Sequence, residues 1–160
     1  MTDPAAVDIL QFANELVRRR NKAALVLTPD LRGVRGYAAQ LATARGALHL
    51  DLLDYFEVHE DLSLVTFSLE ELCSLIARQK PARLLVLSGL EFILGAWFSQ
   101  GESGQVKESL CRRVELWEGP AFLLVTQDDP EFAAYQPTRF RGGQVVVKPL
   151  ASYEKFRSLQ

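Results

Sequence analysis

A chain of 160 residues, 48% of them hydrophobic, has the length of one domain and enough apolar residues to bury a core. Its 18 Lys and Arg residues against 20 Asp and Glu residues leave a formal net charge of −2. This balance excludes a global positive field that would attract nucleic acid or an anionic membrane, so any such contact needs a local patch.

The sequence carries no targeting or membrane signal. Residues 1–20 lack the basic segment and the uninterrupted apolar stretch of a signal peptide, and no apolar run approaches the roughly 18 residues of a membrane span. We therefore expect a cytoplasmic protein without membrane contact. No repeat, low-complexity segment or linker divides the chain, so residues 1–160 are expected to form a single domain. Cys73 and Cys111 stand at apolar positions of helical patterns and are expected to be inert core thiols.

A helix over residues 4–20 is expected to dock ahead of the first strand, with Asp3 as its N-cap and Pro4 at its first position. Its apolar face consists of Ile9, Phe12, Ala13 and Leu16. Five short apolar runs predict strands over residues 23–27, 47–51, 83–88, 121–126 and 144–148.

Helical patterns separate most of these strands. One begins at Val34 and stops at Gly46, and another opens at a capping box of Ser68 and Glu71. A third covers residues 106–117, and a short capped helix is expected within 128–135. Residues 52–67 are interpreted as a connection with at most a short helical or extended piece. The alternation predicts an α/β fold, a three-layer sandwich with a mainly parallel sheet of five strands.

In open parallel sheets, ligands bind beyond the carboxyl ends of the strands. Function is therefore sought in residues 28–33, 88–91 and 126–129. The five strands, with a loop after the first leading into a helix, resemble P-loop NTPases of the AAA+ and RecA-like groups over residues 23–148. The segments LLVLSGLEFIL (84–94) and DPEFAAYQPTRFRGGQVVV (129–147) are most similar to the BrxF family of BREX phage-defence proteins. The resemblance implies that the first strand lies beside the fourth and that the second lies at an edge.

The phosphate-binding loop of these enzymes needs two glycines, a Lys and a Ser or Thr. In the alignment that the resemblance implies, Thr28 takes the first glycine position, Gly33 the second, Val34 that of the lysine and Arg35 that of the hydroxyl residue. The magnesium-linked Asp is replaced by Ser88, while Glu91 falls where an assisting acid would lie, and Thr126 suits the polar sensor position. Both motifs have lost a charged residue.

The sequence therefore favours a noncatalytic P-loop NTPase-like module (a pseudo-NTPase) without a cofactor, acting as a protein-interaction subunit of a larger complex in phage defence or DNA handling. Its partner would be another protein or further copies of the chain. Two alternatives stay open: an active NTPase with an unorthodox site, completed by a neighbouring subunit, and a small DNA-binding subunit.

Local arginines are the residues that would contact an anion or nucleic acid. Arg32 and Arg35 lie before and at the start of a helix, where a phosphate is favoured. Nucleic-acid contact through a wider basic surface would use Arg18, Arg19, Arg20, Arg112, Arg113, Arg139 and Arg141. Ordinary solvated arginines explain the same pattern.

Two further groups of residues are candidates for a metal site and for a partner contact. His49, His59, Glu57 and Glu60 reproduce no metal-ligand spacing, so no metal site is expected. Trp97 and Phe98 are either an exposed partner contact or part of the core.

Overall fold

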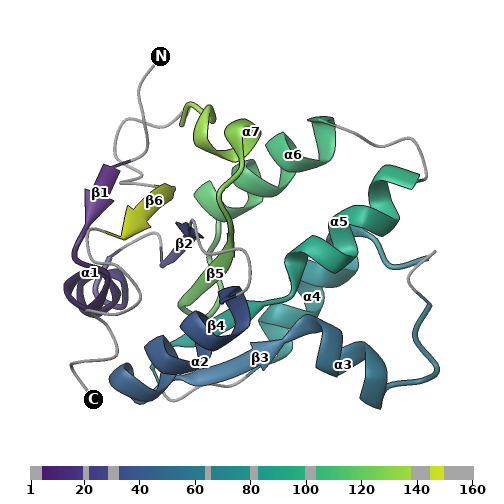
Figure 1. The fold of residues 1–160 in the computed structure, drawn as a ribbon, viewed down its shortest axis with the longest axis horizontal. Helices are drawn as coiled ribbons and strands as arrows, with labels where there is room; N and C mark the ends of the chain where they lie inside the picture. Colours follow the sequence, from purple (N-terminus) through teal and green to yellow (C-terminus); the bar gives the residue numbers. More distant parts are fainter. Residues whose placement is uncertain are drawn as a thin grey trace.

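The computed structural model describes residues 5–19, 22–28, 33–63, 66–79, 83–99, 104–137 and 145–149, and its centre is one all-parallel β-sheet (Figure 1). The six strands, taken from one edge to the other, are β1 (Ala5–Val7), β6 (Val146–Pro149), β2 (Ala23–Thr28), β5 (Phe122–Gln127), β4 (Leu85–Ser88) and β3 (Leu48–Asp51). The first predicted strand, β2, does lie beside the fourth, β5, and the second, β3, lies at an edge. The expected count of five was wrong, because β1 adds a sixth strand.

β1 replaces the beginning of the helix that was expected over residues 4–20. Ala5 pairs with Val147 and Val7 with Pro149, so this short strand extends the sheet at the edge next to β6. Helix α1 (Ile9–Leu16) begins only after Asp8, whose carboxylate accepts the backbone N–H groups of Leu10 at 3.1 Å and Gln11 at 3.4 Å. Asp8 is thus the N-cap. Asp3 and Pro4 lie outside the described residues, whereas the apolar face of the helix was predicted correctly.

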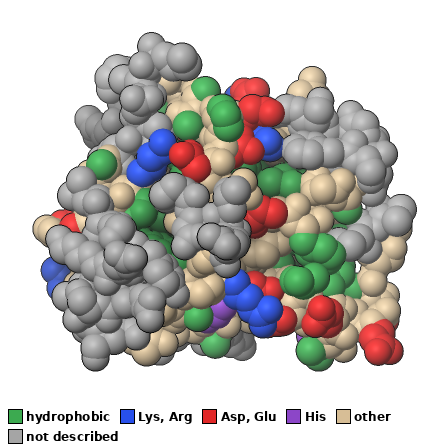
Figure 2. All heavy atoms as spheres, in the orientation of Figure 1, with side chains coloured by type: hydrophobic (Ala, Val, Ile, Leu, Met, Phe, Trp, Pro, Cys, Tyr) green, Lys and Arg blue, Asp and Glu red, His purple; other side chains and the backbone are tan. Residues whose placement is uncertain are grey.

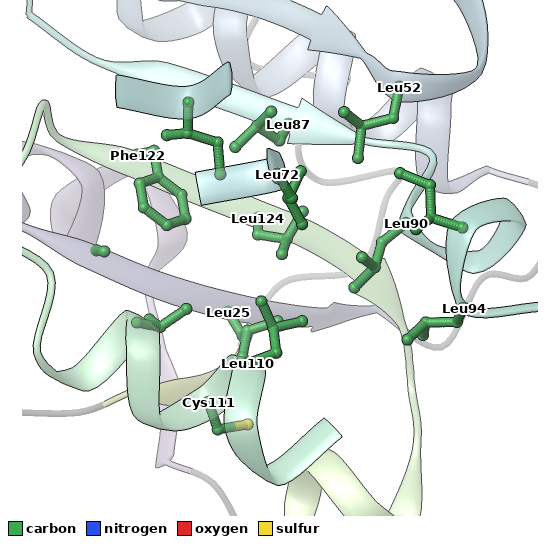
Figure 3. Close-up of a cluster of buried hydrophobic side chains, with 14 of the residues drawn as sticks. Leu25, Leu52, Leu72, Leu87, Leu90, Leu94, Leu110, Cys111, Phe122 and Leu124 are labelled. Atoms are coloured by element: carbon green, nitrogen blue, oxygen red, sulfur yellow. The ribbon is translucent and has the colours of Figure 1, made fainter. Parts of the chain in front are cut away.

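Helices cover the sheet on both faces, as expected for buried parallel strands. α1 and α2 (Val34–Arg45) pack against one face, where alternate strand residues such as Ala24, Val26 and Leu123 point. Helices α4 (Leu69–Arg78), α5 (Leu90–Ser99) and α6 (Gly104–Glu115) cover the other. Figure 3 shows side chains of this second layer, among them Leu25, Leu87 and Leu124 of the sheet with Leu72 and Leu110 of the helices. The result is a three-layer α/β arrangement.

Helix α3 (Leu52–Val58) is a short helical piece of the kind allowed within residues 52–67, whereas α5 occupies a segment for which the sequence pattern predicts no element. α3 follows β3 directly, and α5 follows β4 after a single residue. Trp97 of α5 is buried, and its indole N–H donates to the carbonyl of Phe67 at 2.6 Å. Trp97 is therefore a core residue, while the side chain of Phe98 lies outside what is described. Cys73 and Cys111 are buried as expected, and burial raises the pKa of the Cys111 thiol to about 12.

Helix α7 (Pro130–Ala133) is only four residues long, and polar contacts hold it and its flanking residues against α6, among them the ion pair of Lys107 with Glu131 at 3.5 Å. Buried Lys107 donates to a carboxylate oxygen of Asp129 at 2.6 Å, and Asp129 also caps α7 through its other oxygen. Beyond the helix, the Tyr135 hydroxyl donates to the buried carboxylate of Glu115 at 2.6 Å. Buried charges that are paired in this way fix one position of the short helix. Among the helices described, none is long and apolar enough to cross a membrane.

We expect Gly89→Ala to destabilise the fold by about 1–3 kcal/mol. Gly89 has φ +90°, and an added Cβ would lie 3.0 Å from the backbone nitrogens of both Leu52 and Leu53. The free energy of unfolding in urea should be measured for Gly89→Ala and, as a matched control, for Gly95→Ala. Gly95 lies inside α5, where an added Cβ would meet open space among the described residues, so its replacement should stabilise by about 0.5–1 kcal/mol. Equal effects of the two substitutions would contradict this account of the β4–α5 turn.

Candidate functional site

The carboxyl ends of β3, β4 and β5 and the beginnings of α2, α3 and α5 surround a depression of about 290 Å³, which we call the strand-end hollow. Its lining residues are Val34, Arg35, Asp51, Leu53, Gly89, Glu91, Phe92 and Gln127. Figure 2 shows basic and acidic side chains touching at the lower centre of this face, with hydrophobic side chains to their right over α3 and α5. The hollow lies at the sheet end where ligands bind in open parallel folds.

A buried carboxylate, that of Asp51, organises one wall of the hollow. Its Oδ2 accepts the hydroxyl of Ser88 at 2.7 Å, and its Oδ1 accepts the backbone N–H of Asp54 at 3.2 Å, which caps α3. The Nε2 atom of His49 lies 2.9 Å from the Ser88 oxygen. Because the single hydroxyl hydrogen goes to Asp51, Nε2 must carry a hydrogen and donate to Ser88. His49, Ser88 and Asp51 thus form a directional chain of hydrogen bonds.

Arg35 stands at the mouth of the hollow in the first turn of α2. Its guanidinium pairs with the Asp54 carboxylate, and its Nε lies 4.0 Å from the Asp51 carboxylate. A cation in the first turn of a helix is opposed by the helix dipole, so these carboxylates offset an unfavourable position. The side chain is 60% exposed, which keeps the pair accessible to solvent. The arginine is therefore already engaged by acidic partners.

Glu91 forms the opposite side of the hollow. It lies in the first turn of α5, and its Oε1 accepts the backbone N–H of Gln127 at 3.2 Å. This bond joins the start of α5 to the end of β5. Glu91 gives the hollow an acidic edge. The exposed side chain of Leu53 and the half-buried side chain of Phe92 form an apolar wall.

The structure brings together only some of the residues that the sequence singled out. Val34, Arg35 and Glu91 line the hollow, and Ser88 lies directly behind Asp51 without any exposed surface. Val34 is 8% exposed and packs into the core below α2.

The remaining predicted positions serve the backbone or the core. Thr28 and Thr126 are buried at the ends of adjacent strands and do not line the hollow. The carbonyl of Thr28 accepts the N–H of Asp128 at 2.9 Å. Gly33 precedes α2 as its N-cap, and its carbonyl accepts the N–H of Tyr37 at 2.6 Å.

Sequence reasoning missed Asp51, Asp54 and Phe92, whereas Gln127 lies within residues 126–129, one of the segments expected to hold the site. A signal existed for Asp51, since it ends a predicted strand and the carboxyl ends of strands were the expected site. His49 lies in the predicted strand over residues 47–51, and its ring bonds to Ser88. Within the described residues no group of three or more His, Cys, Asp and Glu side chains is placed to hold a metal ion.

Only some of the arginines that were candidates for an anion or nucleic-acid contact lie within the described residues. Arg18 is exposed, and the guanidinium of Arg19 lies 5.5 Å from the centre of the Phe12 ring, where burial lowers the pKa of Arg19. Arg112 and Arg113 are paired with Glu108 and Glu70. Each of these two arginines therefore already has an acidic partner among the described residues. The other candidates, Arg20, Arg32, Arg139 and Arg141, lie outside the described residues.

No protein-family model and no curated protein matches the sequence. The strand-end hollow therefore has to be interpreted from its own chemistry.

Replacing Ser88 by Ala should destabilise the fold by about 1–3 kcal/mol, because the change leaves a buried carboxylate oxygen and an imidazole N–H without their common partner. Ser74→Ala, at an exposed position of α4, is the matched control and should stay within about 0.5 kcal/mol of the parent. Chemical unfolding measures both variants. Indistinguishable stabilities would mean that the hydrogen-bond chain contributes nothing.

His49 should make stability depend on pH. Burial lowers the pKa of His49. The Asp51 carboxylate acts against this shift by raising the pKa, and the Arg35 guanidinium lowers the pKa further. The unfolded chain, with an ordinary pKa of about 6.5, then binds the proton more tightly than the folded chain. This contribution is present above pH about 6.5 and is lost as the pH falls through the lower folded-state pKa.

The pH dependence can be isolated with His49→Gln, whose amide can still donate to Ser88. Between about pH 7.5 and 5, its free energy of unfolding should fall less steeply than that of the parent. Parallel curves for His49→Gln and the parent would refute the assignment.

Proposed function

We propose that this chain is a noncatalytic, P-loop NTPase-like module that acts as a protein-interaction subunit of a larger complex, of the kind found in phage defence or DNA handling. The observation that carries the proposal is the state of Arg35. Among the described residues it is the one cation that lines the strand-end hollow, and it pairs with Asp54 and lies beside Asp51. A site in which carboxylates outnumber the cation repels a polyphosphate.

The residues at the catalytic positions support the same conclusion. Ser88, where the magnesium-linked acid would stand, has no exposed surface and donates its hydroxyl hydrogen to Asp51. Val34, where the lysine would stand, offers no charge and packs into the core. Metal and phosphate charges without these partners would lose several kcal/mol of transition-state stabilisation.

The hollow measures about 290 Å³, which is close to the lower limit of about 300 Å³ for small-molecule pockets.

The surface beside the hollow suits a protein contact. Exposed apolar side chains lie on edge strand β3 and on α3: Leu48 is 47% exposed, Leu53 38% and Val58 76%. We infer that these side chains contribute to a contact with a partner. Because β3 pairs with one neighbour only in the described sheet, its outer edge adds backbone N–H and C=O groups that a partner can use.

The isolated protein should neither hydrolyse ATP or GTP nor gain thermal stability from them with Mg²⁺. A nucleotide at 100 times its dissociation constant would add about 2.7 kcal/mol of stability, which thermal unfolding detects easily. We expect no shift.

Two variants give the opposite result a clear meaning. A nucleotide-dependent stabilisation that disappears in Arg35→Ala would make this arginine a phosphate ligand and overturn the proposal. Turnover that disappears in Glu91→Gln would establish an unorthodox NTPase. Both variants should instead behave like the parent protein towards nucleotides.

A further inference from the structure

We propose that the strand-end hollow receives a basic side chain, with a guanidinium as its best match, from a protein partner. The inference deepens the proposed function and rests on it, because a bound nucleotide would occupy the same space.

Among the described residues, the acidic side chains around the hollow outnumber the basic ones. Asp51 and Glu91 line it and Asp54 stands at its mouth, whereas Arg35 supplies one guanidinium. Arg35 contacts Asp54 most closely and lies 4.0 Å from Asp51. On the opposite side, Glu91 uses Oε1 for the Gln127 N–H, which leaves Oε2 to accept from an incoming donor. A planar guanidinium with several N–H donors suits a carboxylate in this position.

The apolar wall accommodates the rest of such a side chain. Leu53 and Phe92 line the hollow together with Val34. Arginine and lysine lay their aliphatic stems along apolar surface and keep the charged group at a polar end. The hollow therefore offers separate surfaces for the stem and for the charge, within the dimensions of one side chain.

The surroundings favour a protein as the source of the basic group. Leu53 is shared between the hollow and the exposed apolar surface of α3 and β3. Arginine is enriched among the central residues of protein interfaces, where surrounding contacts exclude water. A free phosphate or a nucleic-acid backbone would instead bring negative charge towards Asp51 and Glu91.

The test is a titration of the ¹⁵N-labelled protein with N-acetyl-arginine amide, followed by amide chemical shifts. The neutral probe N-acetyl-citrulline amide, which has the same length and a urea group, is the ligand control. We expect saturable shifts at Leu53, Gly89 and Gln127 with the arginine probe, and weaker ones with the citrulline probe. The affinity for the arginine probe should fall as salt is added.

Two substitutions should change the affinity in opposite directions. Glu91→Gln keeps an oxygen for the Gln127 N–H but removes the charge, and should weaken binding of the arginine probe about threefold, as expected for an accessible ion pair. Arg35→Ala should strengthen it by a similar factor, because Asp51 and Asp54 lose their cation. Glu118→Gln, an equal charge change at an exposed position away from the hollow, should have no effect.

The inference is wrong if both probes shift the same amides equally, if the shifts lie elsewhere, or if Arg35→Ala weakens binding. These outcomes are independent of the nucleotide experiment. Stabilisation by ATP would remove the noncatalytic function itself, whereas a missing arginine response without any ATP effect would remove only the assignment of the partner.

Discussion

The carboxylate of Asp51 is the contact on which the strand-end hollow depends. A buried charge is costly unless hydrogen bonds and opposite charge compensate it, and Asp51 obtains this compensation from three elements. Ser88 of β4 donates to it, the first turn of α3 is capped by it, and Arg35 of α2 lies beside it. Because the residue ends edge strand β3, one side chain fixes how the edge of the sheet meets two helices.

This arrangement turns the polar groups at the sheet end towards one another. A site that binds phosphate and magnesium must direct its charged groups outwards to them. Here Ser88 is enclosed between His49 and Asp51, and Arg35 is held by acidic side chains. Among the described residues, the lining of the hollow carries two carboxylates, one guanidinium and apolar side chains.

Periodicity was sufficient to predict the central strands, the buried faces of α1 and α2 and the positions of most helices. Periodicity failed at the start of the chain, where Pro4 and the apolar spacing suggested a helix from residue 4. In the structure Asp8 caps the helix, and Ala5–Val7 pair with a strand from the other end of the chain. α5 was missed because its almost wholly apolar sequence shows little amphipathic pattern. At the site, Arg35 and Glu91 were found by position, but the bond of Ser88 to Asp51 joins residues from two strands, and no local motif encodes it.

The order of the strands also determines when the sheet can form during synthesis. β2 lies between β5 and β6, and β1 pairs with β6, so the two earliest strands of the described sheet find their partners in the last part of the chain. Contacts between distant segments carry a large loop-closure cost and form slowly. While the ribosome is still translating the middle of the chain, the apolar strand Ala23–Thr28 has no neighbour with which to pair. β3 and β4, which are closer in sequence, can associate earlier. Because β2 stays unpaired until translation is nearly complete, the nascent chain has to keep this apolar strand from aggregating.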